Sequence, residues 1–99
     1  MTAKFAIYPS LRGKTVFVTG GASGIGAEIV TAFAKQGAKV GFVDMDVARS
    51  EALLAALDGT HGFAPGDLRD IDALKAAFAA LAEKLGPAEV LVNNAARDD

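Results

Sequence analysis

Hydrophobic and polar residues alternate along this chain with two different periods. Short apolar runs rich in β-branched residues, of which residues 15–18 and 40–43 are the clearest, are bounded by polar residues and glycines. Such runs are typical of strands that are covered on both faces. Between the runs, apolar residues recur every three to four positions, as they do on one face of an amphipathic helix. The pattern therefore predicts that strands and helices alternate.

The elements can be bounded from this pattern and from residues that start and stop helices. We expect strands at residues 14–19, 39–44, 62–64 and 89–93, and helices at residues 27–36, 47–57 and 71–85. Asp46 and Asp70 stand where helix N-caps belong, and Gly86 stands at the end of the last helix. His61, the single histidine of the sequence, has no second ligand-type residue at metal-ligand spacing, and we interpret it as a surface residue.

Strands and helices that alternate with short connections indicate βαβ units and a parallel sheet. Right-handed crossovers in a mononucleotide-binding half give the strand order 3-2-1-4. The predicted fold class is α/β, a Rossmann-type doubly wound parallel sheet, of which this chain holds the N-terminal portion. Ligands of such sheets bind in the crevice where the strand order reverses, beside the first and fourth strands.

Composition excludes several classes of protein. The 99 residues make one domain at most, and ten Lys and Arg against twelve Asp and Glu give no electrostatic reason to bind nucleic acid or an anionic membrane. The sequence has no cysteine, so disulfides, thiolate nucleophiles and cysteine metal sites are excluded. The longest apolar run, residues 76–82, is short of the ~18 residues of a membrane span. Without an apolar stretch typical of a signal peptide near the N-terminus, we expect a cytoplasmic protein.

A glycine-rich segment joins the first strand to the first helix. Residues 19–26 read Thr-Gly-Gly-Ala-Ser-Gly-Ile-Gly. Glycines permit a tight turn and let backbone N–H groups approach a pyrophosphate, and the helix N-terminus adds partial positive charge. The candidate phosphate-binding residues are Gly20, Ser23, Gly24, Ile25 and Gly26. The alternative is that the segment is only a turn.

An acidic residue ends the second predicted strand. Asp44 follows Gly24 by twenty positions, and a carboxylate at that place can accept hydrogen bonds from ribose hydroxyls. The alternative is that Asp44 or Asp46 caps the next helix. A carboxylate repels a 2′-phosphate, and the neighbouring Met45 is not basic, so the predicted ligand has a ribose with a free 2′-hydroxyl.

The third and fourth strands also end in candidate site residues. Asp67 and Leu68 follow the third strand, where a carboxylate and its neighbouring backbone can meet the amino group and ring of adenine. The alternative for Asp67 is a turn aspartate before the cap at Asp70. Residues 93–96 read Asn-Asn-Ala-Ala, and for Asn94 we favour a structural role, because asparagine can bond the backbone of a neighbouring loop.

Taken together, these motifs resemble the N-terminal half of a short-chain dehydrogenase/reductase. Thr-Gly-x3-Gly-Ile-Gly, Asp44, Asp67-Leu68 and Asn-Asn-Ala-Ala occur in the family's order, and Ala96 departs from it where glycine is usual. The resemblance implies a nicotinamide cofactor and hydride transfer to or from an alcohol carbon. With Asp44 and the non-basic Met45 at the ribose, the predicted cofactor is NAD rather than NADP. It also implies roles: residues 23–26 hold the pyrophosphate and nearby ribose, Asp44 the adenosine ribose, Asp67 with Leu68 the adenine, and Asn93 with Ala95 line the ribose through their backbone.

The family's catalytic residues have no counterpart in this sequence. The family uses a serine and a Tyr-x3-Lys pair, whereas the single tyrosine here, Tyr8, lies before the first strand and is followed four positions later by Arg12. We therefore expect residues 1–99 to be the N-terminal part of a single NAD-binding Rossmann domain, with the catalytic part absent from this chain. Residues 1–99 alone are expected to be inactive.

The resemblance extends to substrates and assembly. Residues 6–11 and 93–99 are similar to the corresponding segments of bacterial sugar dehydrogenases of this family, the xylose-oxidising type especially. This implies a small-molecule partner, a sugar or polyol whose alcohol carbon is oxidised, and a homo-oligomer, a tetramer or dimer, for the full-length protein. The alternatives are a 3-oxoacyl or general secondary-alcohol reductase acting on a carbonyl, or a non-catalytic nucleotide-binding module.

Overall fold

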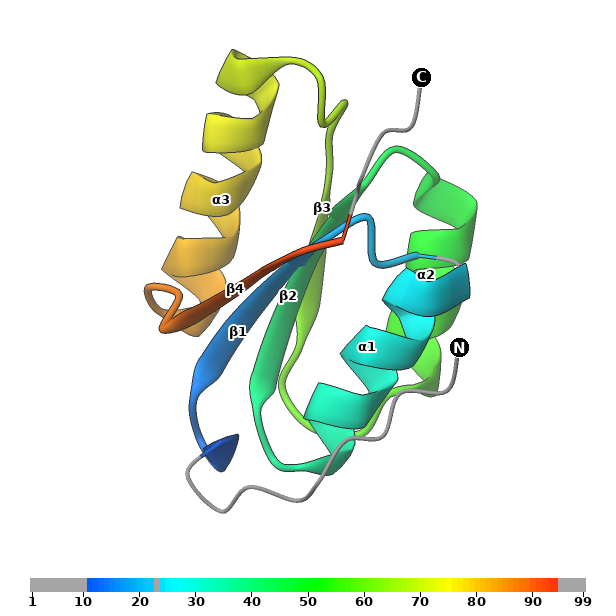
Figure 1. The fold of residues 1–99 in the computed structure, drawn as a ribbon, viewed down its shortest axis with the longest axis vertical. Coiled ribbons are helices and arrows are strands. Elements are labelled where there is room, and N and C mark those ends of the chain that lie inside the picture. The colour runs from blue at the N-terminus through cyan, green and yellow to red at the C-terminus, as the bar shows by residue number, and fades with distance from the viewer. Residues whose placement is uncertain (1–10, 23, 95–99) are drawn as a thin grey trace.

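Strands and helices alternate along the chain in the computed structural model, which describes residues 11–22 and 24–94. The elements in chain order are β1 (Thr15–Thr19), α1 (Gly24–Lys35), β2 (Lys39–Asp44), α2 (Val47–Ala56), β3 (Gly62–Pro65), α3 (Ile71–Leu85) and β4 (Val90–Asn93). The four strands form one parallel sheet in the order β3-β2-β1-β4 (Figure 1). This confirms the predicted fold class and strand order.

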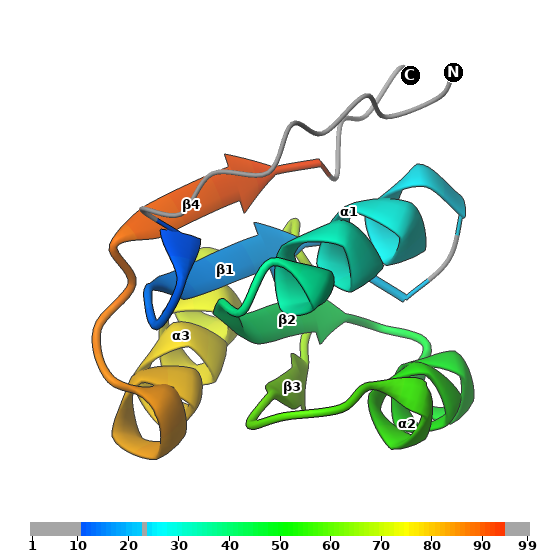
Figure 2. The same ribbon diagram turned by 90° about the horizontal axis from the view of Figure 1, so that it is seen from below.

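Two apolar clusters hold the helices against opposite faces of the sheet, with α1 and α2 on one face and α3 on the other (Figure 2). Val16 and Val18 of β1 belong to the cluster under α1 and α2, whereas Phe17 between them belongs to the cluster under α3. Successive strand residues point to opposite faces. The apolar run in β1 is therefore continuous because both faces of the strand are covered.

The predicted helix caps are confirmed. The carboxylate of Asp46 accepts the N–H of Arg49 at the start of α2, and that of Asp70 accepts two N–H groups at the start of α3. The expected start of α1 at residue 27 is three residues late, because the glycines at its N-terminus carry no apolar periodicity. Ile71, which we counted with the apolar face of α3, is 60% exposed, since it lies in the first turn of the helix.

The interpretation of His61 as a surface residue is wrong, because its side chain is only 6% exposed. Its Nδ1 accepts the N–H of Val40 at 3.0 Å, and its Nε2 lies 2.6 Å from the carbonyl oxygen of Asp58, so Nε2 carries the proton. The pairing of β2 with β3 begins one residue later, at Gly41 and Gly62. The imidazole thus extends the hydrogen bonding of β2 beyond the short strand β3.

Candidate functional site

The residues expected to bind a cofactor converge at one edge of the sheet. Thr19 of β1 is in register with Asn93 of β4 and with Val43 of β2, and Asp44 at the end of β2 is in register with Pro65 of β3. The carboxyl ends of all four strands therefore meet there. The strand order reverses between β1 and β4, where a ligand crevice is expected in such sheets.

The glycine-rich turn is anchored to the neighbouring strand. Gly20 has a φ of +72°, which favours glycine, and its N–H donates to the carbonyl of Val43 at 2.7 Å. Gly26 is buried, and a Cβ atom there would overlap the carbonyl oxygen of Gly20. The absence of side chains therefore lets α1 start directly against the turn. Ser23 lies outside the described residues, so its predicted role stays a prediction.

Asn93 at the end of β4 and Asn94 directly after it are both bonded to the first βα unit. The hydroxyl of Thr19 donates to Oδ1 of Asn93 at 2.9 Å, and Nδ2 of Asn94 donates to the carbonyl oxygen of Gly20 at 3.1 Å. The second hydrogen bond is the structural role expected for Asn94. It connects the end of β4 to the turn, across the crevice edge. Ala95 lies outside the described residues.

The carboxylate of Asp44 is held between two backbone segments. Its Oδ2 accepts the N–H of Ala22 in the glycine-rich turn at 3.1 Å, and its Oδ1 accepts the N–H of Asp46 at 2.9 Å. The helix cap is Asp46, so the alternative interpretation of Asp44 as the cap does not hold. Met45, between the two aspartates, is exposed. The result is a fixed, half-buried carboxylate beside the turn.

The carboxylate of Asp67 is hydrogen-bonded to Arg69, a residue that was not among the predicted site residues. The guanidinium of Arg69 donates from Nε to Oδ1 and from Nη2 to Oδ2, both at 3.1 Å, and the backbone N–H of Arg69 donates to Oδ1 at 2.9 Å. The hydrogen bond to Asp67 and, second, the charge of that carboxylate raise the pKa of Arg69. The Asp-x-Arg spacing is the sequence signal that could have indicated this pair.

Leu68 lies between the crevice edge and the core under α3. It packs against the apolar cluster of that face and lines a hollow of about 200 Å³. Thr19 and Asn93 line the same hollow. Leu68 therefore stands beside the carboxyl ends of β1 and β4, as expected from its position after the third strand.

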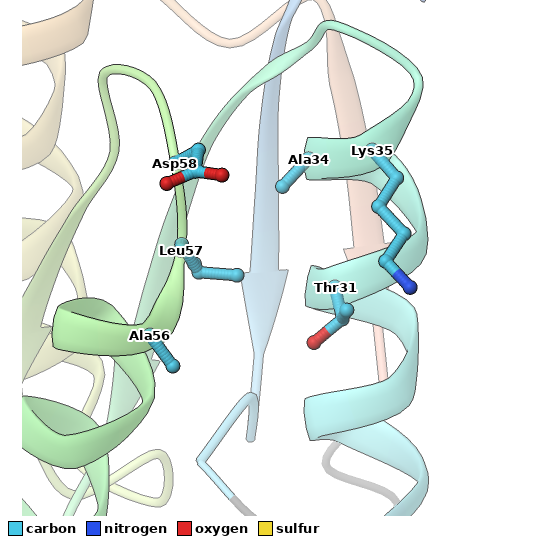
Figure 3. Close-up of a pocket in the computed structure, with 6 residues that line it drawn as sticks. All are labelled: Thr31, Ala34, Lys35, Ala56, Leu57 and Asp58. Carbon is cyan, nitrogen blue, oxygen red and sulfur yellow. The ribbon is translucent and has the colours of Figure 1, made fainter.

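A second hollow, of about 310 Å³, lies between α1 and α2 (Figure 3). It is lined by the C-terminal residues of α1 and α2 and the segment after α2: Thr31, Ala34, Lys35, Ala56, Leu57 and Asp58. None of the predicted site residues lines it. The predicted cofactor residues gather instead where ligands of open α/β sheets bind, so this hollow is not the expected cofactor crevice.

Within residues 11–22 and 24–94, no group of three or more His, Cys, Asp and Glu side chains has the arrangement of a metal site. No helix there is both long and apolar enough to cross a membrane.

Residues 14–99 match the model of the short chain dehydrogenase family, so the chain belongs to that family. A probable galactose dehydrogenase of Rhizobium meliloti is 50% identical over a match that covers 100% of this chain and 40% of that protein. A D-xylose 1-dehydrogenase of Caulobacter vibrioides is 48% identical, with 95% and 38% covered. A D-threitol dehydrogenase of Mycolicibacterium smegmatis is 43% identical, with 86% and 34% covered.

Solved structures of the family share the fold. A double variant of a Serratia marcescens short-chain dehydrogenase/reductase superposes with a TM-score of 0.85 at 36% identity, covering 93% of this chain and 39% of that one. The chain thus spans about two fifths of the length of the relatives that it matches.

Proposed function

We propose that this chain is the cofactor-binding half of an NAD-dependent oxidoreductase that transfers hydride between an alcohol carbon and nicotinamide. The observation that carries the proposal is the carboxylate of Asp44, held beside the glycine-rich turn by the N–H of Ala22. That contact brings together the two features a dinucleotide requires, a turn for the pyrophosphate and an acceptor for the ribose. Nicotinamide, when bound, supplies the hydride acceptor.

The turn fits a pyrophosphate. Gly26 leaves a space in which any Cβ atom would overlap the turn, so α1 begins close against the backbone of β1. The first turn of α1 contains no acidic residue, which leaves the positive end of the helix dipole for an anion. In this proposal Gly20 and residues 23–26 hold the pyrophosphate and the nearby ribose.

Asp44 fits a ribose with a free 2′-hydroxyl. Its two backbone hydrogen bonds orient the carboxylate before any ligand arrives, so orienting it costs the binding event little. An ionised carboxylate accepts from hydroxyls and repels a 2′-phosphate, and exposed Met45 brings no compensating positive charge. This supports NAD over NADP. We assign the adenine to Asp67 and Leu68, and the backbone of Asn93 and Ala95 to a ribose.

The chemistry of proton transfer is assigned to the rest of the protein. Deprotonating an alcohol requires an acid/base within hydrogen-bond reach of it. The single tyrosine, Tyr8, precedes β1 in the sequence and is not followed by the family's lysine. We therefore propose that the catalytic serine and the Tyr-x3-Lys pair lie in the portion of the protein beyond this chain, and that residues 1–99 bind and orient the cofactor.

The substrate proposed is a sugar or polyol. Its support is the names of the similar proteins, which are galactose, xylose and threitol dehydrogenases. A second candidate is a secondary alcohol of another class, favoured by the 41% identity to a 3-beta-hydroxysteroid dehydrogenase of Comamonas testosteroni. The two candidates share the cofactor site and differ only in the substrate pocket.

The test uses the full-length enzyme with NAD and NADP against aldoses, polyols, a hydroxysteroid and a 3-oxoacyl thioester. We expect kcat/KM to favour NAD by about 100-fold or more, as a charge repulsion of several kcal/mol implies. Asp44→Asn should lower that preference about tenfold or more. Asp46→Asn is the matched control, because it removes the same charge two residues away and asparagine remains a good N-cap.

Two outcomes would contradict the proposal separately. A wild-type preference for NADP would overturn the role of Asp44. Turnover only with the steroid or the thioester, and none with any sugar or polyol, would overturn the substrate class and leave the cofactor assignment standing.

A further inference from the structure

The contact that carries the inference lies at the end of β3, where Arg69 binds both carboxylate oxygens of Asp67. Nε and Nη2 of the guanidinium each donate over 3.1 Å, one to each oxygen. A backbone N–H alone reaches one oxygen and leaves the carboxylate able to rotate about its last bond. A two-pronged guanidinium contact fixes the plane of the carboxylate as well as its position.

Arg69 is not required to hold the local backbone. The turn before α3 has its own bond from the N–H of Asp70 to the carbonyl of Asp67, and α3 is capped by the side chain of Asp70. The Arg69 side chain is 62% exposed and that of Asp67 38% exposed. Exposed ion pairs of this kind contribute little to stability. An arginine held in this way therefore calls for an explanation other than folding.

We propose that Arg69 is a positioning residue for base recognition, which holds the carboxylate of Asp67 in one plane so that it accepts a hydrogen bond from the amino group of adenine. The inference rests on the proposed function, in which Asp67 meets the adenine. An ionised carboxylate only accepts hydrogen bonds. A base with a carbonyl oxygen in place of the amino group, such as hypoxanthine, would bring two acceptors together. Sites built to bond an N–H discriminate strongly against analogues without it.

Binding to two dinucleotides tests this. Dissociation constants of NAD and of nicotinamide hypoxanthine dinucleotide are measured by calorimetry on the full-length protein, together with kcat and KM for both. Arg69→Ala should weaken NAD binding about three- to tenfold, the range of one hydrogen bond, and change hypoxanthine dinucleotide binding less than about twofold. The selectivity for adenine should fall accordingly, with kcat unchanged.

Two comparison variants separate geometry from charge. Arg69→Lys keeps the charge but cannot make the planar two-point contact with both carboxylate oxygens. Its selectivity for the adenine dinucleotide should therefore be nearer to that of Arg69→Ala than to that of the wild type. Arg49→Ala removes a similarly exposed arginine paired with Asp46, and should leave the selectivity unchanged. Melting temperatures of Arg69→Ala and Arg49→Ala should agree, which excludes a folding effect as the cause.

Asp67→Ala distinguishes failure of the inference from failure of its premise. If Asp67→Ala keeps the wild-type selectivity, the adenine contact in the proposed function is wrong and the role of Arg69 falls with it. If Asp67→Ala abolishes selectivity while Arg69→Ala keeps it, the inference alone is overturned. Equal weakening of both dinucleotides by Arg69→Ala would also overturn it, since that result would indicate only a general charge effect.

Discussion

β1 and β4 are neighbours in the sheet and each has three consecutive apolar residues, yet their surroundings differ. Every residue of β1 is buried, whereas β4 alternates half-buried and exposed residues, with Leu91 57% exposed. β1 has a strand on each side and helices on both faces. Within the described residues, β4 pairs only with β1. An apolar strand sequence thus predicts that other segments will bury the strand. For β4, residues 11–22 and 24–94 do not supply those segments.

The exposed apolar surface of β4 lies on the face of the sheet that α3 packs against. A hollow of about 360 Å³ beside α3 is lined by apolar groups, among them Phe17, Phe78 and Leu91. The connection from β3 to β4 crosses the sheet in one direction, and its helix, α3, lies on one face. A further parallel strand beyond β4 would continue in the same direction. A right-handed crossover to that strand would therefore place its helix on the face that α3 covers. The remainder of the protein is expected to fill this hollow.

Removing the remainder should have the largest effect. Residues 1–99 expressed alone are expected to show no dehydrogenase turnover, because the family's Tyr-x3-Lys pair has no counterpart in this sequence, and to self-associate through the open edge of β4. Turnover assays and size-exclusion chromatography check this. Leu91→Lys should reduce the self-association. A monodisperse wild-type monomer with dehydrogenase activity would contradict both expectations.

Truncating one side chain in the buried cluster that contains Val16 and Val18 of β1, and one side chain of β4, should sharpen the comparison. In the full-length protein, Phe42→Ala should cost about 3–5 kcal/mol, because Phe42 is fully buried in the cluster that β1 shares. Leu91→Ala should cost about 2–5 kcal/mol if the remainder buries it. Denaturant unfolding of the two variants measures both values. A cost for Leu91→Ala below about 0.5 kcal/mol would mean that the side chain stays exposed in the whole protein.

The smallest effect on stability is expected from removing a charged contact that joins the starts of β1 and β4. Glu89, just before β4, accepts the N–H of Thr15 at 3.0 Å and bonds Lys14 at 3.3 Å, and these contacts, the backbone bond first, lower the pKa of Glu89. Because the pKa of Glu89 is lower in the folded state, its ionised carboxylate stabilises the fold at pH values above the ordinary pKa of glutamate. This stabilisation is lost as the pH falls through the pKa of the folded state.

Thermal unfolding against pH measures this contribution. Glu89→Gln should lower the melting temperature by about one or two degrees at pH 7, with the difference from wild type disappearing toward pH 3. Glu83→Gln, an exposed position on α3, is the matched control and should show no such dependence. A pH-independent difference for Glu89→Gln would show that the carboxylate charge is not the cause.

Local features were predictable because the residues that decide them are close in sequence. Asp46 and Asp70 cap helices whose first N–H groups lie two or three positions away. The interpretation of His61 was wrong for the opposite reason, since its hydrogen-bond partner is Val40, 21 positions earlier. Hydrophobic period carries no information about such a partner.

The sequence by itself determined the alternation of strands and helices, the strand order and the positions of Asp44, Asp67 and the glycine-rich turn at strand ends. These follow from periodicity, capping residues and the handedness of crossovers, all of which act along short stretches of chain. Only the tertiary structure decided that Ala22 holds Asp44, that Asn94 bonds Gly20 and that β1 is covered while Leu91 is not. Each of these depends on packing between segments 22 to 74 positions apart, where side-chain shape and sheet register select the partner.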